Sequence, residues 1–177
     1  SLLITNVVSG GKKTDIFVDE KGTIRAIGPS VRADHKGEAD VMIDGDGALA
    51  LPGLVNTHTH AAMTLLRGYA DDMILQDWLS QKIWPLEAHL TGKDVYWGTK
   101  LASLEMIRSG TTAFNDMYFF MDDAARAVDE AGIRAVLSYG FIDLFNDEKR
   151  ENECKATEKL AAHIRSMNNP RIKTAVG

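Results

Sequence analysis

The chain has 177 residues and a formal net charge of −5, with 20 lysines and arginines against 25 aspartates and glutamates. This mildly acidic balance lacks the basic face that nucleic-acid binders usually need, so we expect no nucleic-acid partner. No apolar run approaches the roughly 20 residues of a membrane-spanning helix, so we expect no membrane partner. Hydrophobic residues make up 45% of the chain, which is ample for a core.

The only cysteine, Cys154, cannot form an internal disulfide, which fits a reducing compartment. The opening stretch SLLITNVVSGGKKTD lacks the basic region and long apolar run of a signal peptide. We therefore predict a cytoplasmic protein.

Residues 1–51 are predicted to form a β-rich segment. Short apolar stretches bounded by Gly, Lys or Asp occur at Leu2–Val8, Asp15–Glu20, Thr23–Gly28 and Val41–Gly47. The Lys-Gly pair between the second and third stretches is typical of a hairpin turn. Strands this short, without helical periodicity between them, predict a small antiparallel sheet or part of a sandwich.

From residue 52 to 177, strands and helices are predicted to alternate, which is typical of an α/β fold with a parallel sheet. The chain offers at most four strand-and-helix steps, and the last strand has no helix after it, so we interpret it as the front part of a longer enzyme. The predicted elements are a strand ending in NTHTH, helical stretches Ala61–Gly68, Ile74–Leu90 and about Lys93–Arg108, strand Thr111–Met117, helix Met121–Gly132, strand Ile133–Gly140, helix Glu151–Met167 and strand Arg171–Gly177.

The segment LPGLVNTHTH carries the clearest chemical pattern. Residues i and i+2 of a strand point to the same side, so His58 and His60 would present two imidazoles in one direction while Thr59 points away. Imidazole binds zinc, iron, nickel and copper, and catalytic zinc usually takes about three protein ligands plus water. The pair therefore predicts part of a metal site. The plain alternative is two polar histidines that face solvent or bond to the backbone.

PGLVNTHTH resembles the first-strand motif of the amidohydrolase superfamily, metal-dependent hydrolases on a (β/α)8 barrel. The runs HTHAAMTLLRGYADDMILQDWL, KIWPLEAHLT and FNDMYFFMDDAARAVDEAGIRA are similar to one branch, the 5′-methylthioadenosine/S-adenosylhomocysteine deaminases and their relatives acting on 5′-deoxyadenosine. The resemblance implies an α/β fold: the N-terminal part of a metal-dependent (β/α)8 (TIM) barrel, with about four βα units at residues 52–177, plus a small β-sandwich segment at residues 1–51.

The resemblance also assigns roles to individual residues. His58 and His60 match the metal-binding pair, and Glu87 matches a glutamate that holds the ribose hydroxyls, since a carboxylate can accept from two neighbouring hydroxyls. Trp78 matches a tryptophan that borders the substrate. Arg150 matches an arginine that meets the amino-acid carboxylate of S-adenosylhomocysteine. The alternative interpretations, without a functional role, are a solvated helix carboxylate for Glu87, core packing for Trp78 and an exposed arginine for Arg150.

Three further positions complete the comparison with the family. Tyr139 stands where relatives often have an arginine that helps to bind substrate, and a tyrosine cannot pair with a carboxylate in that way. This departure weakens the case for S-adenosylhomocysteine and leaves 5′-methylthioadenosine and 5′-deoxyadenosine open. Asn115 and Asp116, at the end of the second barrel strand, are expected to support the site or to make structural hydrogen bonds.

The resemblance implies hydrolytic deamination of the adenine of a small adenosine derivative, with one divalent ion, expected to be zinc, activating the attacking water. The remaining metal ligands and the proton-shuttling glutamate are expected beyond this chain, so we predict no catalytic residue within it and no activity for it alone. We also expect a homo-oligomer. The alternatives are another amidohydrolase, acting on guanine, cytosine or a chlorinated triazine, or a non-catalytic half barrel that needs a partner.

Overall fold

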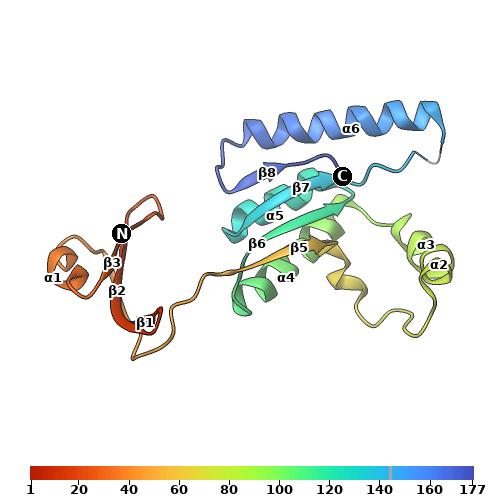
Figure 1. The fold of residues 1–177 in the computed structure, drawn as a ribbon. Helices are drawn as coiled ribbons and strands as arrows, with labels where there is room; N and C mark the ends of the chain where they lie inside the picture. The colour runs from red at the N-terminus through yellow and green to blue at the C-terminus, as the bar shows by residue number, and fades with distance from the viewer. Residues whose placement is uncertain (144) are drawn as a thin grey trace. The chain divides into compact units, whose positions relative to one another are not determined.

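The computed structural model describes residues 1–143 and 145–177, and these fall into two compact units, Ser1–Pro52 and Gly53–Gly177. Figure 1 shows the elements of both units in chain order. Within the described residues, no helix is long and apolar enough to cross a membrane.

The first unit is one four-stranded sheet with the order β3-β2-β1-β4. The antiparallel expectation is correct for the pairs β1–β2 and β2–β3, but β4 lies parallel to β1. The short helix α1, which the sequence pattern did not predict, lies in the connection that brings the chain back for this parallel pairing. The elements are β1 (Leu2–Ser9), β2 (Lys12–Val18), β3 (Ile24–Gly28), α1 (Val31–His35) and β4 (Val41–Asp44).

The predicted hairpin turn between β2 and β3 is confirmed. Gly22 has a φ of +75°, a conformation that glycine adopts without steric cost. The Asp19 carboxylate accepts hydrogen bonds from the backbone N–H groups of Lys21 and Thr23, each at 2.9 Å.

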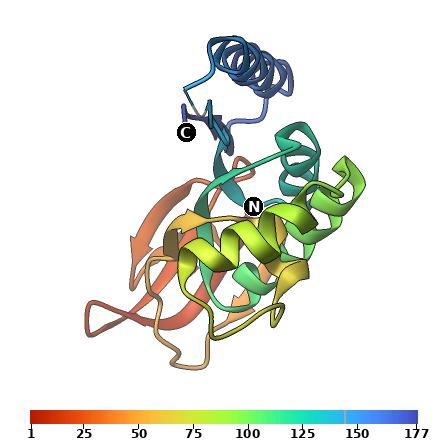
Figure 2. The same ribbon diagram turned by 90° about the vertical axis from the view of Figure 1, so that its right-hand side faces the viewer.

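The second unit contains the predicted parallel sheet, with the order β5-β6-β7-β8 and every adjacent pair parallel. The helices follow one another around it in chain order, with α4 beside α5 and α5 beside α6 (Figures 1 and 2). The elements are β5 (Leu54–Thr59), α4 (Gly92–Arg108), β6 (Thr111–Tyr118), α5 (Met121–Ala131), β7 (Arg134–Tyr139), α6 (Asp147–Ser166) and β8 (Ile172–Thr174).

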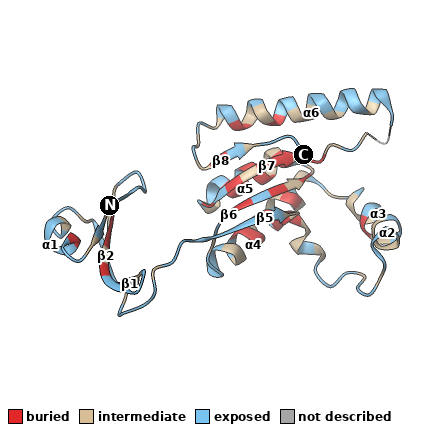
Figure 3. Ribbon diagram, in the orientation of Figure 1, coloured by how far each residue is buried: buried red, intermediate tan, exposed pale blue. Residues whose placement is uncertain are grey.

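The core of this unit lies between the sheet and its helices. Strand residues Phe114, Leu137 and Ile172 are buried in one cluster with residues of all three helices, among them Val128 and Ile164. In Figure 3 the buried residues concentrate on β6, β7 and the inner helix faces, whereas β5 is largely exposed. The side chains that hold the sheet together therefore come mainly from its two central strands.

The segment between β5 and α4 is helical where helices were predicted, but it is not α-helical throughout. The expected helix Ile74–Leu90 is present as one uninterrupted helical stretch made of α2 (Leu75–Trp78), the π-helical turn η2 (Leu79–Ile83) and α3 (Trp84–Glu87), and the stretch expected at Ala61–Gly68 is the 3₁₀ helix η1 (Ala61–Leu66). Pro85 has no N–H for a helical hydrogen bond, which accounts for the wider turn before it. This irregular segment carries both Trp78 and Glu87.

The ends of the longer helices follow local capping rules. Thr91 and Asp94 form a capping box at the start of α4, with Asp94 Oδ2 accepting from the Thr91 N–H at 2.9 Å. Helix α6 begins at Asp147 rather than at the expected Glu151, because Asn146 caps it by accepting from the Lys149 N–H at 2.8 Å.

Candidate metal and substrate site

The two histidines lie at the C-terminal end of β5, the edge strand of the parallel sheet. Their ring centroids are 5.2 Å apart and the ring planes make an angle of 79°. His58 is exposed and His60 is half-buried. The structure therefore brings the two imidazoles together at the end of the strand, where active sites of parallel barrels collect.

One ring nitrogen of His60 is held by the neighbouring strand. Its Nδ1 lies 2.7 Å from the backbone oxygen of Met117 in β6. A carbonyl oxygen only accepts, so Nδ1 carries a proton, and in the neutral imidazole the lone pair is then on Nε2. Metal-binding histidines commonly have this arrangement, in which the second nitrogen donates to a backbone carbonyl or carboxylate.

Thr59, the residue between the two histidines, contacts Asp116 of β6. Thr59 Oγ1 lies 2.9 Å from both Asp116 Oδ1 and the Asn115 carbonyl oxygen, which share its one hydrogen. The Ala61 N–H donates to the same Asp116 oxygen at 2.8 Å. Asp116 is only 1% exposed. One carboxylate oxygen thus binds the residues on both sides of His60.

Burial raises the pKa of the Asp116 carboxyl group above its ordinary value. The hydrogen bonds from Ala61 and Thr59 and the electrostatic interaction with His60 oppose that shift. Its second oxygen, Oδ2, is buried and has no hydrogen-bond partner among the described residues. The expected structural hydrogen bonds therefore account for one oxygen of this carboxylate.

Among the described residues, no group of three or more His, Cys, Asp and Glu side chains is placed to hold a metal ion. The donor set at this edge is two imidazoles, one with its tautomer already set by Met117. Two nitrogen ligands suit zinc but are fewer than the about three that a catalytic zinc site takes from protein. The pair fits a zinc site as part of its ligand set.

Glu87, at the end of α3, contacts the C-terminal end of β6, the strand next to β5. The Tyr118 hydroxyl, at the end of β6, donates to Glu87 Oε1 at 2.7 Å. Burial, and to a smaller extent the interaction with Glu87, raises the pKa of the Tyr118 hydroxyl. The Tyr118 ring centroid lies 6.3 Å from that of His60. Glu87 and the histidine pair are therefore connected through β6.

Trp78 is also brought near the histidines. It lies at the end of α2 and helps to line an open cavity of about 380 Å³ that His60 also lines. The other lining residues are Met63, Thr64, Leu66, Arg67, Gly68, Tyr69 and Asp71.

Arg150 is not brought to this group of residues. Its guanidinium pairs with Asp143, which precedes α6, at 2.7 Å and with Asp147, the first residue of α6, at 2.8 Å. Two carboxylates of its own segment thus hold the side chain that the family resemblance assigned to the substrate.

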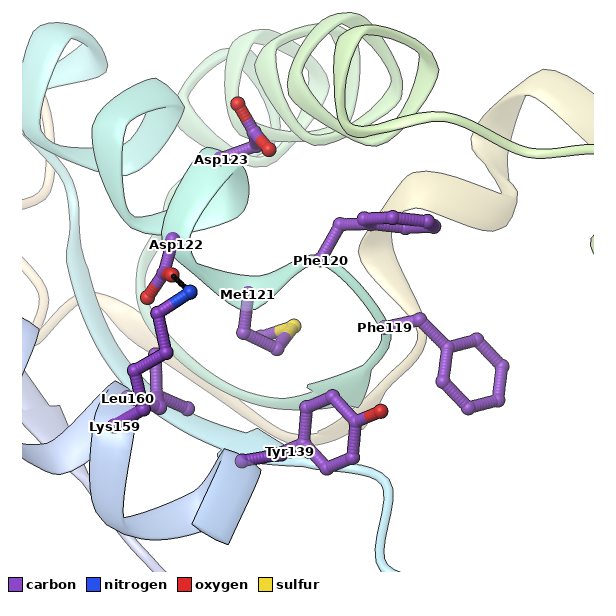
Figure 4. A pocket seen from close by; sticks show the side chains of 9 residues that line it. Phe119, Phe120, Met121, Asp122, Asp123, Tyr139, Lys159 and Leu160 are labelled. Carbon is purple, nitrogen blue, oxygen red and sulfur yellow. Dashed lines mark ion pairs between the residues drawn. The ribbon is translucent and has the colours of Figure 1, made fainter. Parts of the chain in front are cut away.

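Tyr139 lines a different cavity, of about 420 Å³, between the start of α5 and the middle of α6. Figure 4 shows its ring near Phe119 and Met121, with Lys159 and Asp122 paired at one side. The walls of this cavity are mainly aromatic and aliphatic, with the charged groups of Lys159, Asp122 and Asp123 around them.

Sequence reasoning missed two groups at the end of β6, the Met117 carbonyl and the Tyr118 hydroxyl. A backbone carbonyl has no residue signature, so no sequence pattern points to Met117. The topology did offer a signal for Tyr118, since adjacent parallel strands end at the same edge and β6 follows β5 in the sheet.

The amidohydrolase family profile matches residues 49–177. The 5′-deoxyadenosine deaminase of Methanoregula boonei is 71% identical over 177 residues, which cover 100% of this chain and 40% of that protein. The 5′-deoxyadenosine deaminase of Methanocaldococcus jannaschii is 54% identical over 176 residues, covering 99% of this chain and 41% of that protein. The chain thus spans about 40% of the length of these curated relatives.

A solved structure gives the same likeness in three dimensions. The crystal structure of an adenosine deaminase from Xanthomonas campestris with bound zinc matches with a TM-score of 0.83 and 36% sequence identity. The match covers 99% of this chain and 42% of that one.

Proposed function

Because this chain belongs to the amidohydrolase family, as the N-terminal part of a protein of that kind, we propose that the full-length protein hydrolyses the adenine amino group of 5′-deoxyadenosine and releases ammonia. By full-length protein we mean this chain together with the remaining length that its relatives have. 5′-Methylthioadenosine is a second proposed substrate and S-adenosylhomocysteine a weaker third. The names of the relatives support the reaction, and the paired imidazoles at the end of β5 support the place.

His58 and His60 would hold one divalent ion, for which we propose zinc. A zinc ion held there supplies a Lewis acid that activates water. The chain itself contributes the orientation of the ligands: the Met117 carbonyl fixes the His60 ring, and Asp116 binds the backbone on both sides of it.

Glu87 and Trp78 are the proposed substrate contacts. The Glu87 carboxylate would accept from the ribose 2′- and 3′-hydroxyls and so hold the nucleoside in position. The Trp78 side chain would pack on the nucleoside from the cavity that it shares with His60.

The 5′ end of the substrate is proposed to be uncharged. Tyr139 cannot pair with a carboxylate as an arginine does, and the Arg150 guanidinium is already paired with Asp143 and Asp147. Neither side chain therefore favours the amino-acid tail of S-adenosylhomocysteine, which is why that substrate stands third; 5′-deoxyadenosine stands first because the relatives carry its name.

The observation that carries the proposal is the pair of imidazoles with the His60 Nδ1 bound to Met117, close to the Tyr118–Glu87 hydrogen bond. We expect the zinc-loaded full-length protein to release ammonia from 5′-deoxyadenosine with a higher kcat/KM than from guanine or cytosine, and to release no chloride from a chlorinated triazine. Ammonia from the free bases alone, or chloride release, would support the rival amidohydrolase reading.

A matched pair of variants tests the substrate role of Glu87. We expect Glu87→Gln to lower kcat/KM for 5′-deoxyadenosine roughly 100-fold, since hydrogen bonds to a charged group contribute about 1.5–3 kcal/mol each. Glu158→Gln, an exposed position on α6, is the control and should leave kcat/KM unchanged. Equal effects of the two substitutions would contradict the ribose role.

We further propose that the 177-residue chain is inactive by itself, because two imidazoles alone hold zinc weakly. Ammonia release by the purified chain would contradict this. The half-barrel reading predicts that the chain binds a partner or its own copy, which size-exclusion chromatography with light scattering measures. The cytoplasmic location and the homo-oligomeric state stay predictions.

A further inference from the structure

The position of Glu87 is not fixed by its own helix. Glu87 is the last residue of the helical stretch Leu75–Glu87, which contains a π-helical turn and Pro85. Isolated helices shorter than about 12–15 residues are marginal in water, and helix ends fray first. A carboxylate that must meet two ribose hydroxyls therefore needs a partner on a more rigid element.

Tyr118 is that partner. Its side chain is 4% exposed, and its hydroxyl donates to Glu87 Oε1 at 2.7 Å. The backbone of Tyr118 is fixed by pairing with Tyr139 of β7, and its carbonyl accepts from the Gly140 N–H at 2.9 Å. The donor thus comes from the interior of the sheet and the acceptor from the last residue of a helical stretch.

The hydrogen bond leaves most of the carboxylate available. A carboxylate offers about four acceptor positions, of which the Tyr118 hydroxyl takes one on Oε1. Within residues 1–143 and 145–177 no other hydrogen bond to the Glu87 carboxylate is present, so the remaining positions, including those of Oε2, are available for a pair of hydroxyls. Burial raises the pKa of Tyr118, so at neutral pH the hydroxyl keeps the proton that it donates.

Adjacent residues of β6 hold the two halves of the site. The Met117 carbonyl binds His60 Nδ1, and the Tyr118 hydroxyl binds Glu87. The separation between the histidine pair and Glu87 is therefore set by one short stretch of a central strand.

From these contacts we infer that Tyr118 is a positioning residue that orients Glu87 toward the ribose hydroxyls of the substrate and so determines selectivity for nucleosides with an intact 2′,3′-diol. This inference rests on the proposed function. It assigns to Tyr118 an effect on substrate binding that acts through Glu87, with no contact to the reacting atoms.

The test compares Tyr118→Phe with the wild type in the zinc-loaded full-length protein, using 5′-deoxyadenosine and 2′,3′-dideoxyadenosine as substrates. Phe keeps the buried ring and removes only the hydroxyl. We expect KM for 5′-deoxyadenosine to rise about tenfold with kcat within twofold, as for the loss of one hydrogen bond to a charged group. We expect the kinetics with the dideoxy substrate to stay unchanged.

The matched control is Tyr96→Phe, which removes another hydrogen bond between a tyrosine and a glutamate, from Tyr96 to Glu130 at 2.6 Å on the helix layer. It should leave both substrates unaffected. The ratio of kcat/KM for the two substrates does not depend on the folded fraction, so it remains informative if Tyr118→Phe lowers stability.

Two outcomes would overturn the inference, and they differ. If the wild type deaminates 5′-deoxyadenosine but Tyr118→Phe leaves the diol-to-dideoxy ratio unchanged, Tyr118 is only structural and the proposed function stands. If the zinc-loaded wild type deaminates no adenosine derivative, the proposed function fails and this inference fails with it.

Discussion

The Asp116 carboxylate binds together two parts of the chain that are 55 to 57 residues apart in sequence. It accepts from Thr59 and from Ala61, the two neighbours of His60, and it is almost fully buried. Because a buried carboxylate is stable only when it is hydrogen-bonded, these two donors decide whether the strand end carrying the histidines is well formed.

We predict that Thr59→Val destabilises the protein by about 1–3 kcal/mol. The substitution removes a hydrogen-bond donor from the buried acceptor Asp116 Oδ1 without changing the size of the side chain. The free energy of unfolding from urea denaturation measures this. Thr57→Val, an exposed position on the same strand, is the control and should change stability by less than about 0.5 kcal/mol. Equal effects at the two positions would show that the Thr59–Asp116 hydrogen bond is not important.

The sequence predicted residues with recognisable side chains and missed those defined by a partner. The spacing of His58 and His60 in a strand indicates two imidazoles on one side, and the family resemblance assigned the metal role to this pair and the ribose role to Glu87. The Met117 carbonyl and the Tyr118 hydroxyl matter only because β6 ends beside β5, a relation that spans more than 50 residues.

At the level of elements, the contact between α4 and η1 places the segment that follows His60. Helix α4 approaches η1 closely at Gly98, where an added Cβ would lie 2.5 Å from the Ala62 carbonyl oxygen and 2.9 Å from its Cα. Both atoms are backbone, so neither can move as a flexible side chain would. The glycine therefore allows the close approach of the two elements.

We predict that Gly98→Ala is destabilising in spite of the better helix propensity of alanine. Overpacking costs about 1–3 kcal/mol, against the roughly 1 kcal/mol that alanine gains over glycine inside a helix. Thermal unfolding measures the difference. Gly37→Ala is the control, since a Cβ there would meet nothing within 4 Å. A Gly98→Ala protein at least as stable as the wild type would contradict the close packing described here.

The start of α4 is stabilised by the capping box of Thr91 and Asp94. Thr91→Ala should lower the free energy of unfolding by about 1 kcal/mol, the usual effect of losing an N-cap. The hydrogen bonds from Thr91 lower the pKa of Asp94 below its ordinary value of 3.8. A lowered pKa stabilises the folded state above that value, and the stabilisation is lost as the pH falls through the folded-state pKa.

Asp94→Asn should therefore be less stable than the wild type at pH 7, and the difference should shrink below about pH 4. Urea denaturation at several pH values tests this. A difference that stays constant down to pH 2 would mean that the charge of Asp94 contributes nothing to the cap.

How well each element was predicted depended on its length. Strands and helices of eight residues or more show a full period of apolar positions, and β6, α4 and α5 match the expected ranges closely. The isolated short pieces α1 and η1 have five and six residues, too few to show a full period, and α1 was not predicted. The expected helix Ile74–Leu90 is present over Leu75–Glu87 and carries both proposed substrate contacts, but its apolar pattern gave no sign of the π-helical turn within it.

For the whole chain, the sheet of the second unit has β5 and β8 at its edges, and Leu54 and Val55 of β5 are 62% and 64% exposed. An edge strand leaves unpaired backbone groups, whereas the strands of a closed barrel have neighbours on both sides. From the family resemblance we expect further strands next to these edges in the full-length protein.

Hydrogen–deuterium exchange measures this directly. In the 177-residue chain, we predict that amides of β5 exchange faster than those of β6 and β7, and that β5 becomes protected in the full-length protein. Protection of β5 equal to that of β6 in the 177-residue chain would mean that a partner or a second copy already covers the edge, as the half-barrel reading requires.

We propose that His58 and His60 bind one metal ion. Competition with a chromophoric chelator measures the zinc affinity of the full-length protein and tests this binding directly. We predict one zinc per chain and a loss of affinity of at least 100-fold in both His58→Ala and His60→Ala, with His163→Ala on α6 unchanged. Zinc affinity that survives both substitutions would contradict the claim.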